Sequence, residues 1–77
     1  MVDFSHHVPG RLRIRDGRLK SNAQAIASLR ADLGRVNGIT SISANAATGS
    51  ITILYDRHSL DPAVIWKTLR QLGHESP

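Results

Sequence analysis

The sequence contains no cysteine, and Trp, Tyr and Phe occur only once each. Without cysteine the chain forms no disulfide, no thiolate metal site and no thiol nucleophile. No apolar run approaches the roughly 20 residues that cross a bilayer, and the N-terminus lacks the apolar core of a signal peptide. These absences lead us to expect a cytoplasmic protein without membrane insertion.

The length and the charge of the chain set the scale of any site. A chain of 77 residues provides one modest core, since a domain of this size buries only about 60% of its extended-chain surface. Ten Lys and Arg residues against six Asp and Glu residues give a net charge of +4, and eight of the ten cations are arginine. Arginine makes forked contacts with carboxylates and phosphates. The composition therefore indicates either a surface for an anionic partner or a solvated basic surface.

The first nine residues read as a short leader that ends at the turn signal Pro9-Gly10. Residues 11–15 (RLRIR) then alternate strictly between arginine and an aliphatic residue, which predicts a half-buried strand. The dipeptide Asp16-Gly17 ends this strand. We therefore divide the chain into a leader over residues 1–9 and a single domain over residues 10–77.

Two helices are predicted from apolar residues that recur every three or four positions. The first helix follows a polar cap at Ser21 or Asn22. Asp61 caps the second helix, and Pro62 suits its first turn. The apolar stripes that face the core are Ile26, Leu29, Leu33 and Val36 in the first helix and Ile65, Leu69 and Leu72 in the second.

Between the helices, residues 39–45 and 50–55 read as two strands joined by a hairpin at residues 46–49. The order βαββα(β) predicts an α+β ferredoxin-like sandwich, in which two helices cover one face of an antiparallel sheet. The strand over residues 11–15 would keep an open edge. Such an edge recruits either the leader, folded back over residues 2–8, or a second copy of the chain in a homodimer.

The hairpin resembles that of the heavy-metal-associated domains of metal chaperones and P-type ATPases. The segments that carry the resemblance are Gly38-Ile39-Thr40-Ser41-Ile42, Thr48-Gly49 and the strand that closes on Tyr55-Asp56. The resemblance covers roughly residues 22–73. It implies the sandwich fold, a role in metal handling and a metal-transport protein as a partner.

The two thiols that usually define these domains are missing here. Counting back from Gly38, they would fall near Asn22 and Ala25, neither of which binds soft metals. The chain is therefore identified as a member of a cysteine-less branch that opens with His-His-Val-Pro-Gly-Arg-Leu-Arg at residues 6–13. The resemblance does not imply copper or zinc bound through Cys-x-x-Cys.

Histidine is the remaining candidate ligand for a transition metal. His6 and His7 are the strongest candidates, because neutral imidazole binds Ni, Zn, Cu and haem iron without thiols. Adjacent residues of an extended segment point to opposite sides, so a single metal would take only one of the two. The predicted topology brings the leader toward Tyr55, with Asp56 or His58 available to complete the site. The alternative is that these histidines are solvated surface residues.

Arg11, Arg13 and Arg15 share one face of their strand, and together with Tyr55 they form the predicted ligand-contacting set. Haem needs an axial nitrogen for its iron and cations for its propionates, which a histidine beside three guanidinium groups would supply. The same arginines could instead be a solvent-facing surface that protects an edge strand from aggregation. His74 follows the last helix and should lie at the opposite end of the sheet.

The sequence carries no catalytic signature: a nucleophile elbow, a Gly-rich phosphate loop and a His-Glu-x-x-His motif are all lacking. We interpret the chain as a non-enzymatic binding module for a transition-metal centre, either haem iron or a bare Ni, Zn or Cu ion. Two other functions stay open. One is a protein-interaction or regulatory domain of a metal-transport system without a ligand of its own. The other is a nucleic-acid-binding domain, although the aromatic residues on which RNA-binding sheets stack bases are scarce.

Overall fold

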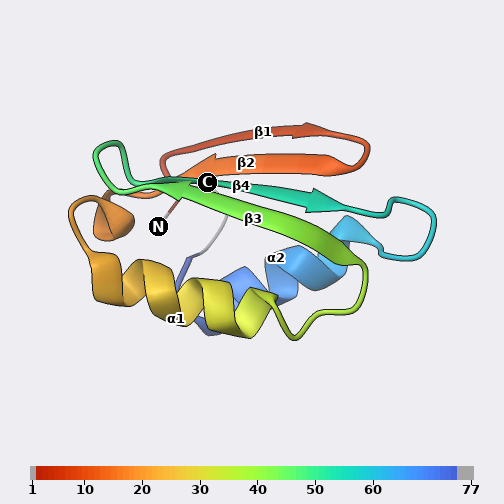
Figure 1. The fold of residues 1–77 in the computed structure, drawn as a ribbon. Helices are drawn as coiled ribbons and strands as arrows, with labels where there is room; N and C mark the ends of the chain where they lie inside the picture. The colour runs from red at the N-terminus through yellow and green to blue at the C-terminus, as the bar shows by residue number, and fades with distance from the viewer. Residues whose placement is uncertain (1, 75–77) are drawn as a thin grey trace.

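The computed structural model describes residues 2–74, which form a four-stranded sheet with two helices on one face (Figure 1). The elements in chain order are β1 (Phe4–Val8), β2 (Arg11–Arg15), the 3-10 turn η1 (Gly17–Leu19), α1 (Ala23–Leu33), β3 (Ile39–Asn45), β4 (Ser50–Tyr55) and α2 (Pro62–Gln71). All pairings are antiparallel, and the strands lie in the order β1-β2-β4-β3. The predicted α+β ferredoxin-like fold is confirmed.

The leader contributes strand β1 and so occupies the edge of β2. Val8 lies opposite Arg11 and Phe4 opposite Arg15. The two strands are joined by Pro9 and Gly10, and Gly10 has a φ of 87°; proline followed by a residue with positive φ is the pattern of a type II turn. Of the two partners predicted for this edge, the structure contains the leader. The optional last strand of the predicted order falls on residues 75–77, which lie outside the described residues.

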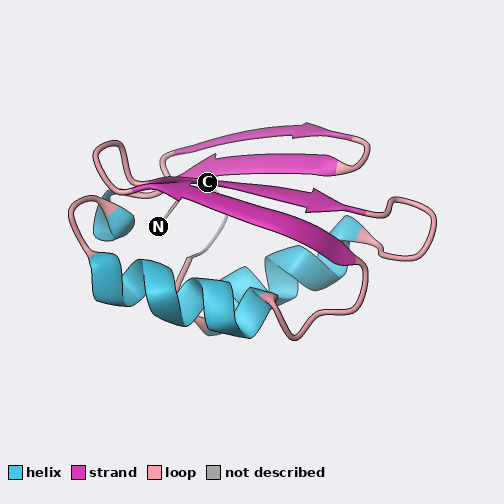
Figure 2. Cartoon of the chain, viewed as in Figure 1, coloured by secondary structure: helices cyan, strands magenta, loops and turns pink. Residues whose placement is uncertain are grey.

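The core lies between the sheet and the helices, and it follows from the alternation within β2. Leu12 and Ile14 are fully buried, whereas Arg13 and Arg15, on the opposite side of the strand, are exposed. The other buried hydrophobic residues are Val2, Leu19, Leu29, Leu33, Ile51, Ile53, Tyr55, Leu60, Ile65 and Leu69. Within residues 2–74, the face of the sheet that carries the arginines is covered by no helix (Figure 2).

Both helices begin at side chains that cap their free backbone N–H groups. Asn22, one of the two predicted caps of α1, accepts a hydrogen bond from the N–H of Ala25 at 3.0 Å. Asp61 accepts a hydrogen bond from the N–H of Ala63 at 2.9 Å, and Pro62 follows it in the first turn of α2. Each cap stabilises its helix by about 1 kcal/mol. In the described part of the chain, no helix is long and apolar enough to cross a bilayer.

The hairpin between β3 and β4 closes against the end of β2 through Gly49. Its φ is +70°, and its carbonyl accepts a hydrogen bond from the N–H of Asp16 at 3.0 Å. A Cβ atom at this position would lie 2.6 Å from the carbonyl oxygen of Asp16 and 3.0 Å from the backbone nitrogen of Lys20. Both the backbone conformation and the close approach therefore require glycine.

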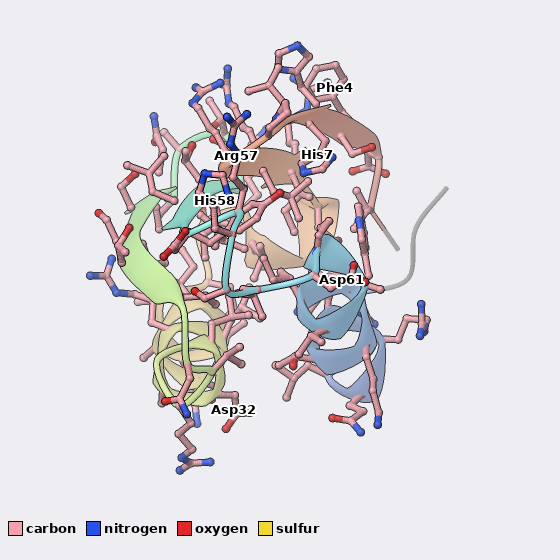
Figure 3. All side chains as sticks on the ribbon, turned by 90° about the vertical axis from the view of Figure 1, so that its right-hand side faces the viewer. Phe4, His7, Asp32, Arg57, His58 and Asp61 are labelled. Carbon is pink, nitrogen blue, oxygen red and sulfur yellow. The ribbon has the colours of Figure 1, made fainter. Side chains whose placement is uncertain are left out.

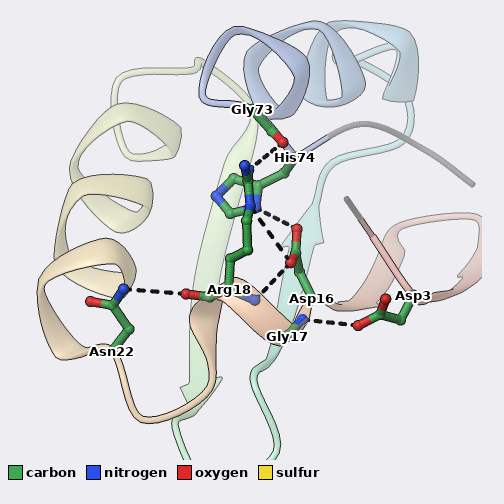
Figure 4. Close-up of polar contacts among 7 residues, drawn as sticks. All are labelled: Asp3, Asp16, Gly17, Arg18, Asn22, Gly73 and His74. Carbon is green, nitrogen blue, oxygen red and sulfur yellow. Dashed lines mark hydrogen bonds and ion pairs between the residues drawn. The ribbon is translucent and has the colours of Figure 1, made fainter.

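A buried hydrogen bond between Asp16 and His74 joins the end of β2 to the segment after α2 (Figure 4). Asp16 is fully buried, and its Oδ2 lies 2.7 Å from Nδ1 of His74, which is also buried. The N–H of Arg18 donates to Oδ1 of Asp16 at 2.9 Å. Burial by itself would raise the pKa of Asp16, but the hydrogen bonds from His74 and Arg18 outweigh it, so the pKa lies below its ordinary value.

Further hydrogen bonds bring both ends of the described chain to the same place. The N–H of Gly17 donates to the carboxylate of Asp3 at 2.9 Å, and the Arg18 guanidinium donates to the carbonyl of Gly73 (Figure 4). This cluster lies beyond the last residue of β2, whereas Tyr55 lies at the other end of the sheet. His74 is therefore at the end of the sheet that the topology predicts.

We expect Gly49→Ala to lower the free energy of unfolding by about 1–3 kcal/mol, because the new methyl group meets backbone atoms and the φ stays positive. Urea unfolding followed by circular dichroism measures the effect. Gly17→Ala is the matched control, since a Cβ there would lie 3.5 Å from the Asp3 carboxylate, an ordinary contact. Equal unfolding midpoints for the two variants would contradict the steric argument.

We expect Asp16→Asn to destabilise the fold at neutral pH by about 1–3 kcal/mol, because it weakens the hydrogen bonds that a buried carboxylate makes with His74 and Arg18. A carboxyl whose pKa is lowered by folding stabilises the protein above its unfolded-state pKa, about 3.9. That stabilisation is lost as the pH falls through the lower folded-state pKa. The difference between wild type and variant should therefore shrink in acid, as measured by urea unfolding between pH 7 and pH 2.

Asp32→Asn provides the control for this pair. Asp32 contacts Arg35 at 2.8 Å, but the Arg35 side chain is 79% exposed. An exposed pair of this kind contributes about 1 kcal/mol or less. A similar loss of stability in the two variants would show that burial of Asp16 has no special effect.

Candidate metal-centre site

The sheet face turned away from the helices gathers several of the predicted ligand residues. The register aligns His6 with Arg13 and Arg13 with Thr52, so these side chains form a row across β1, β2 and β4. Neighbouring rows follow from the two-residue period of the strands. We call this surface the open face; its residues on these three strands are Phe4, His6, Val8, Arg11, Arg13, Arg15, Ser50, Thr52 and Leu54.

His6 places an imidazole on the open face. It is exposed, and within residues 2–74 it makes no hydrogen bond or ion pair. Phe4 and Val8, two positions away on the same strand, lie on the same face, and Arg13 lies directly opposite. Because no group of residues 2–74 bonds to its ring nitrogens, His6 can donate a nitrogen lone pair to a metal.

The three arginines of β2 present positive charge that the described chain does not neutralise. Within residues 2–74, Arg11, Arg13 and Arg15 form no ion pair with a carboxylate. The Arg15 guanidinium carbon lies 5.6 Å from the centroid of the Phe4 ring, a cation–π contact. Arg11 and Arg13 line a shallow hollow of about 210 Å³ together with Thr52 and polar residues of β3. These guanidinium groups are available to anionic groups of a ligand.

Exposed apolar side chains lie among these charges. Phe4, Val8 and Leu54 are 43%, 41% and 40% exposed. Val8 and Leu54 flank Arg11 in the register, and Phe4 lies beside Arg15. These side chains therefore add apolar surface to the arginines of the open face. None of these three residues is a predicted ligand from the sequence, although Pro9-Gly10, interpreted as a hairpin turn, would have aligned the leader with β2.

His7 lies on the helix side of β1, where it meets Tyr55. Figure 3 shows His7 pointing toward the helices and Phe4 pointing away from them. Nε2 of His7 is hydrogen-bonded to the Tyr55 hydroxyl, and the two rings are stacked with their centroids 6.0 Å apart. Tyr55 is buried. Because the phenol occupies Nε2 of His7, a metal would have to displace it to bind at that atom.

The loop that follows β4 begins directly after Tyr55 and carries Asp56 and His58. Figure 3 labels His58 in this loop. The N–H of His58 donates to Oδ1 of Asp56 at 2.9 Å, and this hydrogen bond holds the pKa of the carboxyl below its ordinary value. Within residues 2–74, no group of three or more His, Asp or Glu side chains could hold a metal ion. The structure thus separates the predicted ligands into His6 with the arginines, His7 with Tyr55, and the loop residue His58.

The comparisons with known proteins extend the resemblance drawn from the hairpin. Residues 1–76 match the family described as heavy metal associated domain 2, so the match includes the His-His and arginine segment. No curated protein and no solved structure matches the chain. The match indicates a module for metal binding or metal handling in general. The sequence and the fold together make this chain a cysteine-free member of the heavy metal associated domain 2 family.

Proposed function

We propose that the chain is a non-enzymatic module that binds haem on the open face, with His6 as an axial ligand of the iron. The observation that carries the proposal is the strand register, which sets His6 opposite Arg13 and between Phe4 and Val8. Membership of a heavy-metal-associated family supports metal handling in general. The identity of the ligand rests on the chemistry of the open face.

The number of available donors favours haem over a bare ion. A bare Zn ion takes three or four protein ligands, and the described residues bring no such group together. Haem supplies four ring nitrogens itself and needs one or two axial ligands. A single exposed imidazole such as His6 is therefore sufficient for haem and insufficient for a bare ion.

The surroundings of His6 match the rest of a haem molecule. The propionates are carboxylates, and arginine pairs with carboxylates through two parallel hydrogen bonds. Arg11, Arg13 and Arg15 supply such groups on the strand next to His6. The porphyrin ring is broad and apolar, and Phe4 and Val8 supply exposed apolar contacts on either side of the imidazole.

A second candidate is a bare Ni, Zn or Cu ion at the end of the sheet where His7 meets Tyr55. His58 and Asp56 lie in the loop beyond β4, and both are exposed. This candidate requires the loop to rearrange, because the present geometry does not join these donors into one group. It also requires the bond between His7 and Tyr55 to break.

The open face offers less to nucleic acid. RNA-binding sheets of this fold stack bases on aromatic residues of the two central strands. The central strands here are β2 and β4, which present arginines, Ser50, Thr52 and Leu54 on the open face. Tyr55 is buried on the other face, and Phe4 lies on an edge strand. Basic charge without a stacking platform therefore favours a ligand with carboxylates.

We expect the purified chain to bind haem with a saturable shift of the Soret band. His6→Ala should weaken binding at least about tenfold, or about 1.4 kcal/mol, and should move the band, because the axial nitrogen is lost. Arg13→Gln should weaken binding several-fold while the band position stays unchanged. The measurement is an absorbance titration at physiological salt.

His7→Ala is the matched control, because its imidazole is adjacent in sequence but lies on the other face. Its Soret band and affinity should match those of the wild type, once circular dichroism shows that the variant is folded. Haem binding that depends on His7 and not on His6 would contradict the proposed site. Calorimetric binding of a bare ion that His7→Ala abolishes and Tyr55→Phe strengthens, without haem binding, would favour the second candidate, because the phenol competes with the metal for Nε2 of His7. Binding of neither ligand would leave a protein-interaction or regulatory domain of a metal-transport system.

A further inference from the structure

We propose that the outer edge of β3 binds an extended acidic segment of a partner protein, which adds to the sheet as a fifth strand. This site is distinct from the open face and does not depend on haem binding. In the strand order β1-β2-β4-β3, the strand β3 pairs only with β4 within the described chain. Every second residue of such an edge strand directs its N–H and C=O away from the sheet.

The edge lacks the features that usually prevent pairing. Natural edge strands are protected by lysine, by other charged residues or by proline. The sequence of β3 is ITSISAN, which has no charged residue and no proline. A bulge between Ile39 and Ser41 disturbs one end, whereas Ser41 to Asn45 keep a regular register with β4. A regular, uncharged stretch of strand is therefore open to a partner.

A hollow beside this edge supplies a place for a side chain of the added strand. It has a volume of about 250 Å³ and lies between β3 and the end of α1. Its lining residues are Arg30, Gly34, Ile39, Thr40, Ser41 and Ile42. Peptide recognition by strand addition takes its affinity from backbone hydrogen bonds and its specificity from pockets that receive alternate side chains. Here the edge of β3 provides the backbone hydrogen bonds, and the hollow provides the pocket for a side chain.

Arg30 determines the chemistry of the partner. Its side chain is exposed and lines the hollow. Within residues 2–74 it forms no ion pair, in contrast to Arg35, which is paired with Asp32. An aspartate or glutamate on the added strand would pair with the Arg30 guanidinium, and a net charge of +4 on the chain favours an acidic partner.

A second copy of the chain is a poorer occupant of this edge. Its β3 carries no carboxylate to meet Arg30. Pairing two β3 strands would also bring together two chains that each carry a net charge of +4. An acidic peptide would hydrogen-bond to the edge of β3, place a side chain in the hollow and pair with Arg30.

The test is a titration of the isotope-labelled full chain with a capped six-residue peptide of alternating valine and threonine that contains one aspartate, followed by NMR. Chemical shifts should move in residues 39–45 and 30–34 and stay fixed in the open-face arginines. Arg30→Gln should weaken binding about three- to tenfold, equivalent to roughly 0.7–1.4 kcal/mol. Arg35→Gln is the matched control on the same helix, and its affinity should stay within about twofold of the wild type.

Two altered peptides complete the experiment. N-methylation of alternate backbone amides should abolish binding, because it removes the hydrogen bonds to β3. Replacing the aspartate by lysine should weaken binding more than Arg30→Gln does, because the lysine also repels the Arg30 guanidinium. Absence of shifts at millimolar peptide, shifts centred on the open face, or equal binding of the N-methylated peptide would each overturn the proposal. Shifts of β3 that follow protein concentration alone would overturn it in favour of a second copy.

Discussion

The pairing of β2 between β1 and β4 is the constraint on which the rest of the molecule depends. Since side chains alternate along a strand, fixing Leu12 and Ile14 toward the helices fixes the arginines on the other face. The same register carries over to β1 and sets His6 beside Arg13. A core of aliphatic residues and a charged surface are thus two sides of one five-residue strand. Neither can change position without the other.

Local signals made most of the fold predictable. Strict alternation in RLRIR, the helical spacing of the two apolar stripes, and the caps at Asn22 and Asp61 each specify a short segment without help from distant residues. Strand β1 lacks such a signal, because all five of its residues are exposed and no apolar alternation is needed. Its position depends on the turn at Pro9-Gly10. The pair of Asp16 and His74 could not be read from the sequence, since 58 positions separate them.

The candidate site was predictable in its residue types more than in its arrangement. Histidine beside arginine suggested a metal centre with anionic groups, and the structure does place His6 next to Arg13. The separation of His6 from His7 follows from strand geometry. The contact between His7 and Tyr55, however, depends on where β1 ends relative to β4. The exposed apolar residues Phe4 and Val8 gain meaning only once β1 is known to lie in the sheet.

The two successive histidines in β1 affect how the strand tolerates a change in the length of the turn that follows it. The short turn at residues 9–10 joins β1 to β2 and sets their register. Gain or loss of one residue in this turn would move every side chain of β1 to the opposite face of the sheet. With a single histidine, such an event would remove the imidazole from the arginines. With two in succession, a neighbouring ring takes the vacated place. The repeated residue therefore keeps an imidazole on the open face, where the proposed ligand lies, after insertion or deletion of one residue in the turn.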